Sequence, residues 1–277
     1  MSNKDVIILG SGLSILDLSS EEINYINQCE VIIAINKFMA FYQKSQILPN
    51  HIYFVDAYDL SNVNFLQHIF NVCRKNKLEG LTFIISKTIL EHPMTGQRFC
   101  SKRIAFILKK KYLEIENEIH NKLFHGEKAN TNLFLIPENC KFELISHQHW
   151  LEGNIWGDSL QKPLFHYRGS LSTVLNYVSI KYPQRTIKLI GVDFNSPRYF
   201  FQDELEKLNF VWKDWTTSIT QEKKTHFSAI PYQGTTIFDK FDFMLKNLDG
   251  TGNIVYSCNR DSLLIEKGLV KYSAVIS

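Results

Sequence analysis

A glycine-containing loop near the start of the chain has the composition of a phosphate-binding turn. The loop is Gly10-Ser-Gly-Leu-Ser14, between a short β-branched run and an amphipathic stretch. Backbone N–H groups at a strand-to-helix junction, with the helix N-terminus, attract a phosphate or a sugar nucleotide. The loop lacks the third glycine of the dinucleotide fingerprint and the lysine of a P-loop, so NAD binding and ATPase activity are less favoured. The alternative is a tight turn in which the glycines serve packing alone.

Further polar side chains follow predicted strands, at the edge where open α/β sheets bind ligands. Asn36 and Asp56 each come directly after a strand and suit a nucleoside base or ribose, although a turn role is equally open. Gly191 and Asp193 follow a later strand in the same way. Arg168 stands just before a helix, where a guanidinium could bind a phosphate or a carboxylate, or simply lie on the surface.

Histidines supply the remaining candidates. His226 lies in a loop rich in aromatic residues, where an imidazole could take a proton from an acceptor hydroxyl or merely be solvated. His147 and His149 share one face of a possible strand, without a third ligand at zinc-site spacing. The chain has no Asp-x-Asp pair, with which many sugar transferases hold a divalent ion on a diphosphate. We therefore expect no metal ion in the reaction.

Alternating strands and helices would bring these residues to one edge of a sheet. Strands are predicted over residues 6–9, 30–35, 52–55, 81–85, 186–190 and 253–257. Helices are predicted over residues 15–26, 60–75, 171–182 and 235–248, with a short one after Asn259. This order is typical of a mostly parallel, open α/β sheet with helices on both faces, the Rossmann-like architecture.

We expect a single domain over residues 1–277 with two less regular stretches. Residues 87–165 contain a basic helix (102–112), a polar segment and weak strands near Leu133 and Phe142, which indicates an insertion or a sheet edge. Residues 195–233 have no sustained period, are rich in aromatic side chains and are long for a connection. We expect this second stretch to be a flexible lid or acceptor loop.

Composition limits the class of partner and the compartment. The net charge is only +3, which does not favour nucleic acid as the main partner but suits an anionic small molecule or membrane surface. The 5 cysteines are widely spaced, without a C-x-x-C pair, so neither a disulfide framework nor a zinc ribbon is indicated. The apolar runs are too short for a signal peptide or membrane span. We expect a cytoplasmic protein, at most peripheral to the inner face of the membrane.

Four segments carry a resemblance to a known family. They are Ile7-Ile-Leu-Gly-Ser-Gly-Leu-Ser14, Ala34-Ile-Asn-Lys-Phe38, Tyr167-Arg-Gly-Ser-Leu-Ser-Thr173 with Leu189-Ile-Gly-Val-Asp-Phe194, and Tyr256-Ser-Cys-Asn-Arg-Asp-Ser-Leu-Leu264. In this order they resemble motifs of the bacterial sialyltransferases of glycosyltransferase family 42. The segments span nearly the whole chain but cover a minority of its residues. The resemblance implies a mostly parallel α/β sheet with a flexible lid.

The resemblance also implies an activity. The family moves sialic acid from a CMP-activated donor to a glycan, so we expect transfer of sialic acid, or a related acidic sugar such as Kdo, to a cell-surface glycan. Lipooligosaccharide or capsule biosynthesis would be the setting. The transfer would invert the anomeric carbon and need no cofactor, because a CMP leaving group is a phosphate monoester that hydroxyls and N–H groups can stabilise.

Site residues follow from the same resemblance. The nucleotide phosphate would lie on Gly10, Ser11, Gly12 and Ser14, the ribose or cytosine near Asn36 and Asp56, and the nucleoside beside Gly191 and Asp193. Arg168 would lie at the edge of the donor pocket. Tyr199 resembles the second phosphate-binding tyrosine of the lid, and His226 would be the catalytic base, with Tyr232 competing for that role. The chain departs from the family at Ser11, where Asn is usual, and at Asn195, where Tyr is usual.

Two other function classes stay open. One is a pyrophosphokinase of the pterin-diphosphokinase-like group, which has a similar Gly-x-Asp segment but would use ATP and magnesium and so require a cluster of carboxylates. The other is a non-catalytic module that binds a sugar nucleotide. The pattern specifies neither the acceptor and linkage nor the oligomeric state, and it is compatible with a homo-oligomer.

Overall fold

The computed structural model describes residues 3–55, 60–87, 137–148, 155–208 and 225–276. The chain divides into two compact units, the first formed by Met1–Tyr53 with Ile145–Ser277 and the second by Phe54–Leu144. Within the described residues, no helix is long and apolar enough to cross a membrane.

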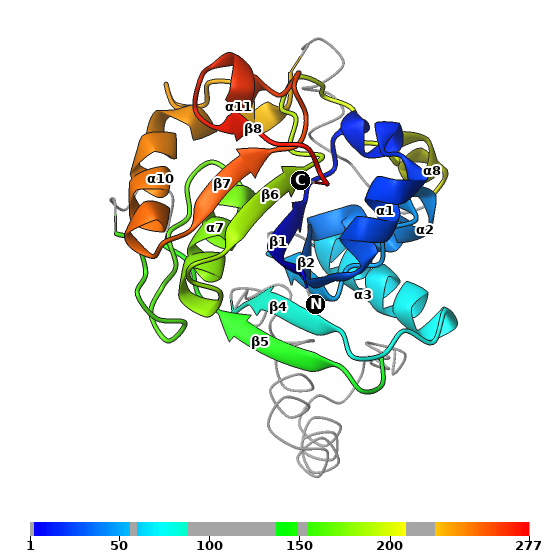
Figure 1. Cartoon of the computed structure of the whole chain (residues 1–277). Helices are drawn as coiled ribbons and strands as arrows, with labels where there is room; N and C mark the ends of the chain where they lie inside the picture. Colours follow the sequence, from blue (N-terminus) through cyan, green and yellow to red (C-terminus); the bar gives the residue numbers. More distant parts are fainter. Residues whose placement is uncertain (1–2, 56–59, 88–136, 149–154, 209–224, 277) are drawn as a thin grey trace. The chain divides into compact units, whose positions relative to one another are not determined.

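A parallel sheet forms the centre of the first unit (Figure 1). Its strands are β1 (Asn3–Leu9), β2 (Cys29–Ile35), β3 (His51–Phe54), β6 (Thr186–Ile190), β7 (Ile254–Ser257) and β8 (Lys271–Tyr272). They lie in the order β3-β2-β1-β6-β7-β8, and each neighbouring pair is parallel. Because the chain order reverses at β1, between β2 and β6, this is the point where open α/β sheets bind ligands.

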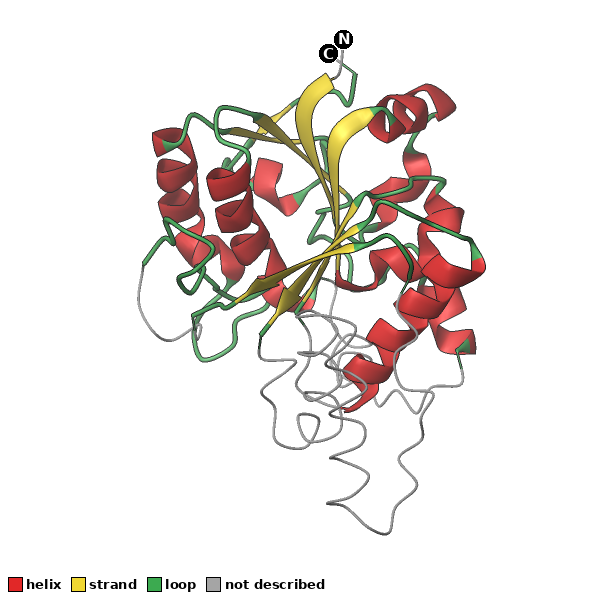
Figure 2. Ribbon diagram, turned by 90° about the horizontal axis from the view of Figure 1, so that it is seen from below, coloured by secondary structure: helices red, strands yellow, loops and turns green. Residues whose placement is uncertain are grey.

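Helices cover both faces of this sheet (Figure 2). Among the described residues of the unit, the α-helices are α1 (Ser20–Asn27), α2 (Tyr42–Ser45), α7 (Ser170–Lys181), α8 (Gln202–Lys207), α10 (Phe241–Gly250) and α11 (Leu263–Glu266). The 3-10 turns are η1 (Leu13–Asp17), η2 (Asn36–Phe41), η3 (Phe227–Ala229) and η4 (Ile237–Lys240). Helices α7 and α10 lie on one face, and α1 and α2 on the other. Nearly all of α7 is buried.

The second unit contains α3 (Leu60–Lys75), β4 (Thr82–Ser86) and the start of β5 (Lys141–Ile145). Strands β4 and β5 are neighbours, and every residue of β4 is buried. Phe83 of β4 stacks on Phe142 of β5 with ring centroids 5.2 Å apart, and Phe70 of α3 meets Phe83 edge-on at 5.0 Å. Aromatic packing therefore joins the helix to the strands.

The structure confirms the predicted open, parallel α/β fold, but several element boundaries differ. The helix predicted over 15–26 is the 3-10 turn η1 followed by α1, because Ser19 and Glu22 form a capping box that begins a new helix. The helix predicted over 235–248 is likewise divided into η4 and α10. Strand β8 was not predicted, since two residues are too few to show a period.

Part of the predicted lid is packed into the core of the first unit. Phe200 and Phe201 are only 2% and 0% exposed. Phe200 contacts Phe38 with ring centroids 5.2 Å apart, and Phe201 stacks on Phe41 at 4.3 Å. Although the sequence places both residues in a stretch expected to be flexible, these two side chains are therefore fixed in the core. Residues 209–224, which include Phe210, lie outside the described residues, as do the basic helix over 102–112, the strand near Leu133, Asp56 and His149.

Candidate functional site

The glycine loop is fastened to the end of β6. The N–H of Gly10 donates to the carbonyl of Ile190 at 2.8 Å, and the N–H of Gly12 donates to the carbonyl of Gly191 at 2.7 Å. A Cβ on Gly10 would collide with the Gly191 backbone. A Cβ on Gly12 would collide with the carboxylate of Asp193. The two glycines thus permit close packing, and their N–H groups are used within the protein rather than free for a phosphate.

The carboxylate of Asp193 ties three strand ends together. Asp193 is 4% exposed. Its Oδ2 accepts from Ser14 N at 3.0 Å, and its Oδ1 accepts from Ser14 Oγ at 2.6 Å and from Asn259 Nδ2 at 2.9 Å. Because Ser14 follows β1 and Asn259 follows β7, Asp193 holds the ends of these strands beside its own strand β6. Sequence reasoning missed Asn259 as a site residue, although it lies within a motif quoted for the resemblance.

Three residues at the same edge of the sheet have a strained backbone conformation. Asn36, Arg168 and Phe194 adopt the left-handed region, with φ of 52°, 57° and 60°. Such a conformation costs free energy in any residue with a side chain, and it collects at functional sites. The Nδ2 of Asn36 donates to Ser170 Oγ at 3.0 Å. This bond joins the end of β2 to the first turn of α7.

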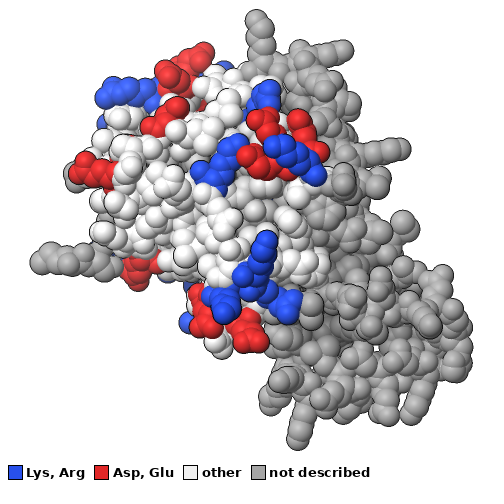
Figure 3. All heavy atoms as spheres, turned by 90° about the vertical axis from the view of Figure 1, so that its right-hand side faces the viewer, with Lys and Arg blue, Asp and Glu red and all other residues white. Residues whose placement is uncertain are grey.

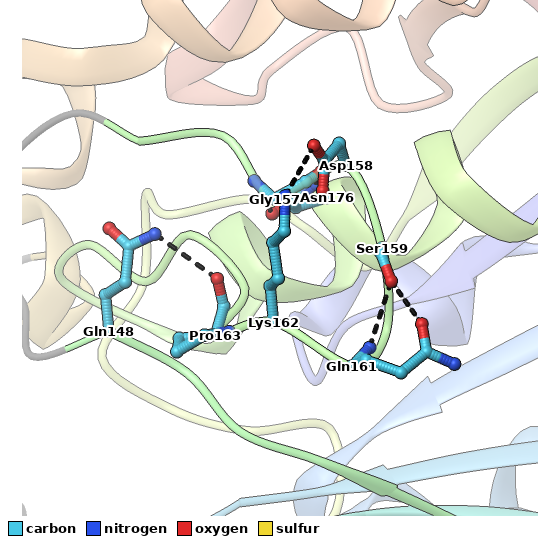
Figure 4. A network of polar contacts seen from close by, with 8 residues as sticks. All are labelled: Gln148, Gly157, Asp158, Ser159, Gln161, Lys162, Pro163 and Asn176. Carbon is cyan, nitrogen blue, oxygen red and sulfur yellow. Dashed lines mark hydrogen bonds and ion pairs between the residues drawn. The ribbon is translucent and has the colours of Figure 1, made fainter.

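The segment that leads into Arg168 is held by a buried side chain of α7. Asn176 Oδ1 accepts from Gly157 N at 2.9 Å and from Phe165 N at 2.8 Å, while its Nδ2 donates to Gly157 O at 2.8 Å. Figure 4 shows Asn176 beside Gly157, and Gln148 donating to Pro163 from the neighbouring chain segment. The sequence analysis missed Asn176, although an Asn on a helix with many apolar residues could have indicated a buried polar contact. Asn176 fixes the path of the chain toward Arg168.

The guanidinium of Arg168 holds a turn that lies far away in the sequence. Its Nη2 donates to Ile230 O at 2.8 Å and to Phe227 O at 3.4 Å. The ring of Tyr232 lies 5.2 Å from the guanidinium carbon. Burial lowers the pKa of Arg168, and its Nε is buried without a hydrogen-bond partner among the described residues. Among the described residues no carboxylate forms an ion pair with Arg168, and Asp239 acts on it only as a weaker, longer-range attraction that raises its pKa.

The imidazole of His226 lies in the turn that Arg168 holds. The backbone N–H of His226 donates to Phe194 O at 3.0 Å. The ring is half-buried, with its centroid 5.7 Å from that of Phe194 and 6.3 Å from that of Tyr199. Burial lowers the pKa of His226 to about 4, so the ring is uncharged at neutral pH. Its Nδ1 accepts from Ser228 N at 3.2 Å.

Two tyrosines for which the sequence predicts a role in the site lie on either side of this turn. Tyr199 stacks on Phe201 with ring centroids 5.3 Å apart, and Lys37 Nζ lies 5.9 Å from the Tyr199 ring. Tyr232 is 54% exposed. The structure therefore brings Asn36, Arg168, Tyr199 and His226 together at the carboxyl ends of β2 and β6.

Comparisons with known proteins add one structural likeness. No family model and no curated protein matches the chain. A solved structure, the MAf glycosyltransferase from Magnetospirillum magneticum AMB-1, superposes with a TM-score of 0.43 at 13% sequence identity. The match covers 93% of this chain and 32% of the other, so the chain spans about a third of that protein's length.

The other predicted candidates lie apart from this cluster or outside the description. His147 packs against His166 with ring centroids 4.7 Å apart, and no group of three potential metal ligands occurs among the described residues.

An ion pair joins two helices on the surface of the first unit: Nζ of Lys44 in α2 lies 2.7 Å from Oε2 of Glu204 in α8. The face of the first unit that carries these two helices mixes acidic and basic side chains (Figure 3). That mixture agrees with the small net charge of the chain.

Proposed function

We propose that the chain is a glycosyltransferase that moves sialic acid, or a related acidic sugar, from its CMP-activated form to a glycan acceptor. The transfer would invert the anomeric carbon and need no metal ion or other cofactor. The observation that carries the proposal is the half-buried guanidinium of Arg168, which forms no ion pair with a described carboxylate and lies at the edge of the sheet where ligands bind.

Charge complementarity supports an anionic donor. A guanidinium in a half-buried site is stabilised by a phosphate or carboxylate that can accept two of its N–H groups. Arg168 commits Nη2 to two carbonyls, while Nε has no described partner. A CMP-activated acidic sugar has both a phosphate and a carboxylate, and either one could accept from Arg168.

The neighbouring residues suit the remaining parts of such a donor. Asn36 and Ser11 would lie near the nucleoside and phosphate, and Tyr199 would offer its hydroxyl to the phosphate. The bonds made by Gly10, Gly12, Ser14 and Asp193 support the loop beneath them. In the reaction, an acceptor oxygen forms a bond to the anomeric carbon as the bond from that carbon to the phosphate oxygen breaks. The products are the glycoside and CMP, and the hydroxyl proton passes in net to solvent.

A thermal-shift screen tests the choice of nucleotide. A ligand that binds only the native state raises the melting temperature. At a free ligand concentration of a hundred times the dissociation constant, the native state gains about 2.7 kcal/mol of stability. We expect CMP with EDTA to stabilise the protein more than UDP, ADP or ATP does, whether these are tested with EDTA or with magnesium. Stabilisation by ATP with magnesium, and none by CMP, would contradict the proposal and favour a pyrophosphokinase.

A further inference from the structure

The turn around His226 determines which ring nitrogen carries the proton. In a neutral imidazole one nitrogen is a donor and the other an acceptor. The backbone N–H of Ser228 points at Nδ1 over 3.2 Å, and an N–H can only donate. Nδ1 must therefore be the unprotonated nitrogen. The single proton of the neutral ring is on Nε2.

Three contacts keep the turn in this conformation. Arg168 donates to Phe227 O and Ile230 O, on either side of Ser228. The N–H of His226 donates to Phe194 O at 3.0 Å. Ser228 is 2% exposed and packs so closely on Gly169 that a Cβ there would lie 3.0 Å from Ser228 Oγ. The donor that selects the tautomer is consequently held in place by residues outside the turn.

Burial, rather than a charged partner, keeps the ring neutral. Arg168 lies against the turn from the start of α7, and Lys37 of η2 lies over the Tyr199 ring that faces His226. Tyr232 and Asp239 interact with Arg168 rather than with the imidazole. Burial of the ring disfavours an imidazolium. No hydrogen bond joins Nε2 to a described residue, so its N–H can donate to a ligand.

We propose that His226 is a hydrogen-bond donor, through Nε2, to the phosphate of the sugar donor, and not the base that removes the acceptor proton. The identity of the phosphate rests on the proposed function. The assignment of the ring tautomer does not depend on the proposed function. The base role that the resemblance implies would need a lone pair on Nε2, which this tautomer lacks.

The donor role has a clear use in the transfer. As the bond from the anomeric carbon to the phosphate oxygen breaks, the phosphate gains a second negative charge. An N–H aimed at that oxygen stabilises the charge without transferring its proton. Because a phosphate monoester has a second pKa of about 6, the leaving group needs no protonation near neutral pH. His226 is unchanged at the end of the step, and the acceptor proton goes to solvent.

Nitrogen NMR of the full chain labelled in histidine tests the tautomer directly. We expect Nε2 of His226 to carry the proton and Nδ1 to be unprotonated, with no titration from about pH 8 to about pH 5, below the reference histidine pKa of about 6.5. The His226→Gln variant identifies the signal by its loss. A proton on Nδ1, or titration near the reference pKa, would overturn the proposal whatever the substrate is.

Calorimetric binding of CMP to matched variants tests the donor role. The amide N–H of His226→Gln can replace Nε2–H, whereas His226→Asn is too short to reach the same point, and His226→Ala has no donor. We expect Gln to bind CMP within about threefold of the native chain, and Asn and Ala to bind at least about tenfold more weakly, the size of a lost hydrogen bond to a charged group. His147→Ala, a histidine outside the cluster, should bind normally.

The outcomes separate the two claims. Equal CMP affinity for the native chain and His226→Ala would overturn the donor role. If the native chain binds another nucleotide and not CMP, the proposed function fails, and the same variants are then compared with that nucleotide. A Gln variant as weak as Ala would also contradict the donor role, provided that the Gln variant melts at the native temperature.

Discussion

At the scale of single residues, strand-end positions were predictable and their partners were not. Asn36 and Asp193 stood out because polar residues that follow buried strands collect at one edge of a parallel sheet. Arg168 stood out because it precedes a helix, and His226 because it lies in a loop rich in aromatic residues. Ser228 and Asn259 did not. Asn259 donates to Asp193, which is 66 residues away in the sequence, and the N–H of Ser228 meets the His226 ring only in the turn that Arg168 holds. Such a role depends on tertiary structure and leaves no pattern in the sequence.

The charge of Arg168 gives the first prediction. Arg168→Gln should weaken CMP binding about tenfold to a hundredfold, because one charge-assisted hydrogen bond is lost. Arg168→Lys should be intermediate, since it keeps the charge but not the planar fork. Isothermal calorimetry measures both. Arg185→Gln is the control, because Arg185 pairs with Glu30 (Nη2 to Oε2, 3.3 Å), away from the cluster. Native affinity in Arg168→Gln would count against an anion at this position.

The lowered pKa of His226 gives the second prediction. Its pKa is about 4 in the folded protein and lies near the reference value in the unfolded chain. The unfolded chain therefore binds a proton first as the pH falls, and stability decreases from about pH 6.5 toward about pH 4. His226→Gln should remove this part of the decrease. Urea unfolding at a series of pH values measures it, and an identical pH slope in the variant would show that the histidine is not shielded.

At the scale of elements, helices and strands with a regular apolar period were predicted with the correct bounds, whereas the points at which one element gives way to the next were not. The helix over 60–75 and the strand over 186–190 were predicted with the bounds of α3 and β6, because their apolar periods are uninterrupted. The division of residues 13–27 into η1 and α1 depends on a capping box within an amphipathic stretch. The burial of Phe200 and Phe201 depends on Phe38 and Phe41, about 160 residues earlier, which no local period could show.

The junction of the glycine loop with β6 gives the third prediction. Gly12→Ala should destabilise the protein by about 1–3 kcal/mol, because the added methyl collides with the Asp193 carboxylate. Gly250→Ala is a matched control, since no atom lies within 4 Å of a Cβ there. Thermal unfolding of the two variants compares them. If Gly12→Ala melts with Gly250→Ala, the loop is not packed as described.

At the scale of the whole molecule, one buried cation contacts both the first strand and the last few described residues of the chain. Lys188 of β6 is 1% exposed, and its Nζ lies 2.9 Å from Asp5 Oδ2 in β1 and donates to Val275 O at 2.8 Å. Because β1 carries the glycine loop at its other end, this link supports the site from a distance.

The fourth prediction concerns that link. Lys188→Ala should lower the free energy of unfolding by about 3–5 kcal/mol, since it leaves the Asp5 carboxylate without its cation and opens a cavity. Lys246→Ala, on an exposed position of α10, should change it little. Denaturant unfolding measures both. A loss below about 1 kcal/mol in Lys188→Ala would mean that water replaces the cation without cost.

The central claim is that the cluster of Arg168, Tyr199 and His226 uses a CMP-activated acidic sugar without a metal ion. The most direct measurement is the release of CMP from CMP-sialic acid and from CMP-Kdo, with and without an acceptor glycan, in matched buffers that contain either EDTA or magnesium. We predict that at least one donor is consumed, at a rate that EDTA does not change and that His226→Ala lowers by about two orders of magnitude or more. No release from either donor, or turnover only with ATP and magnesium, would contradict the account.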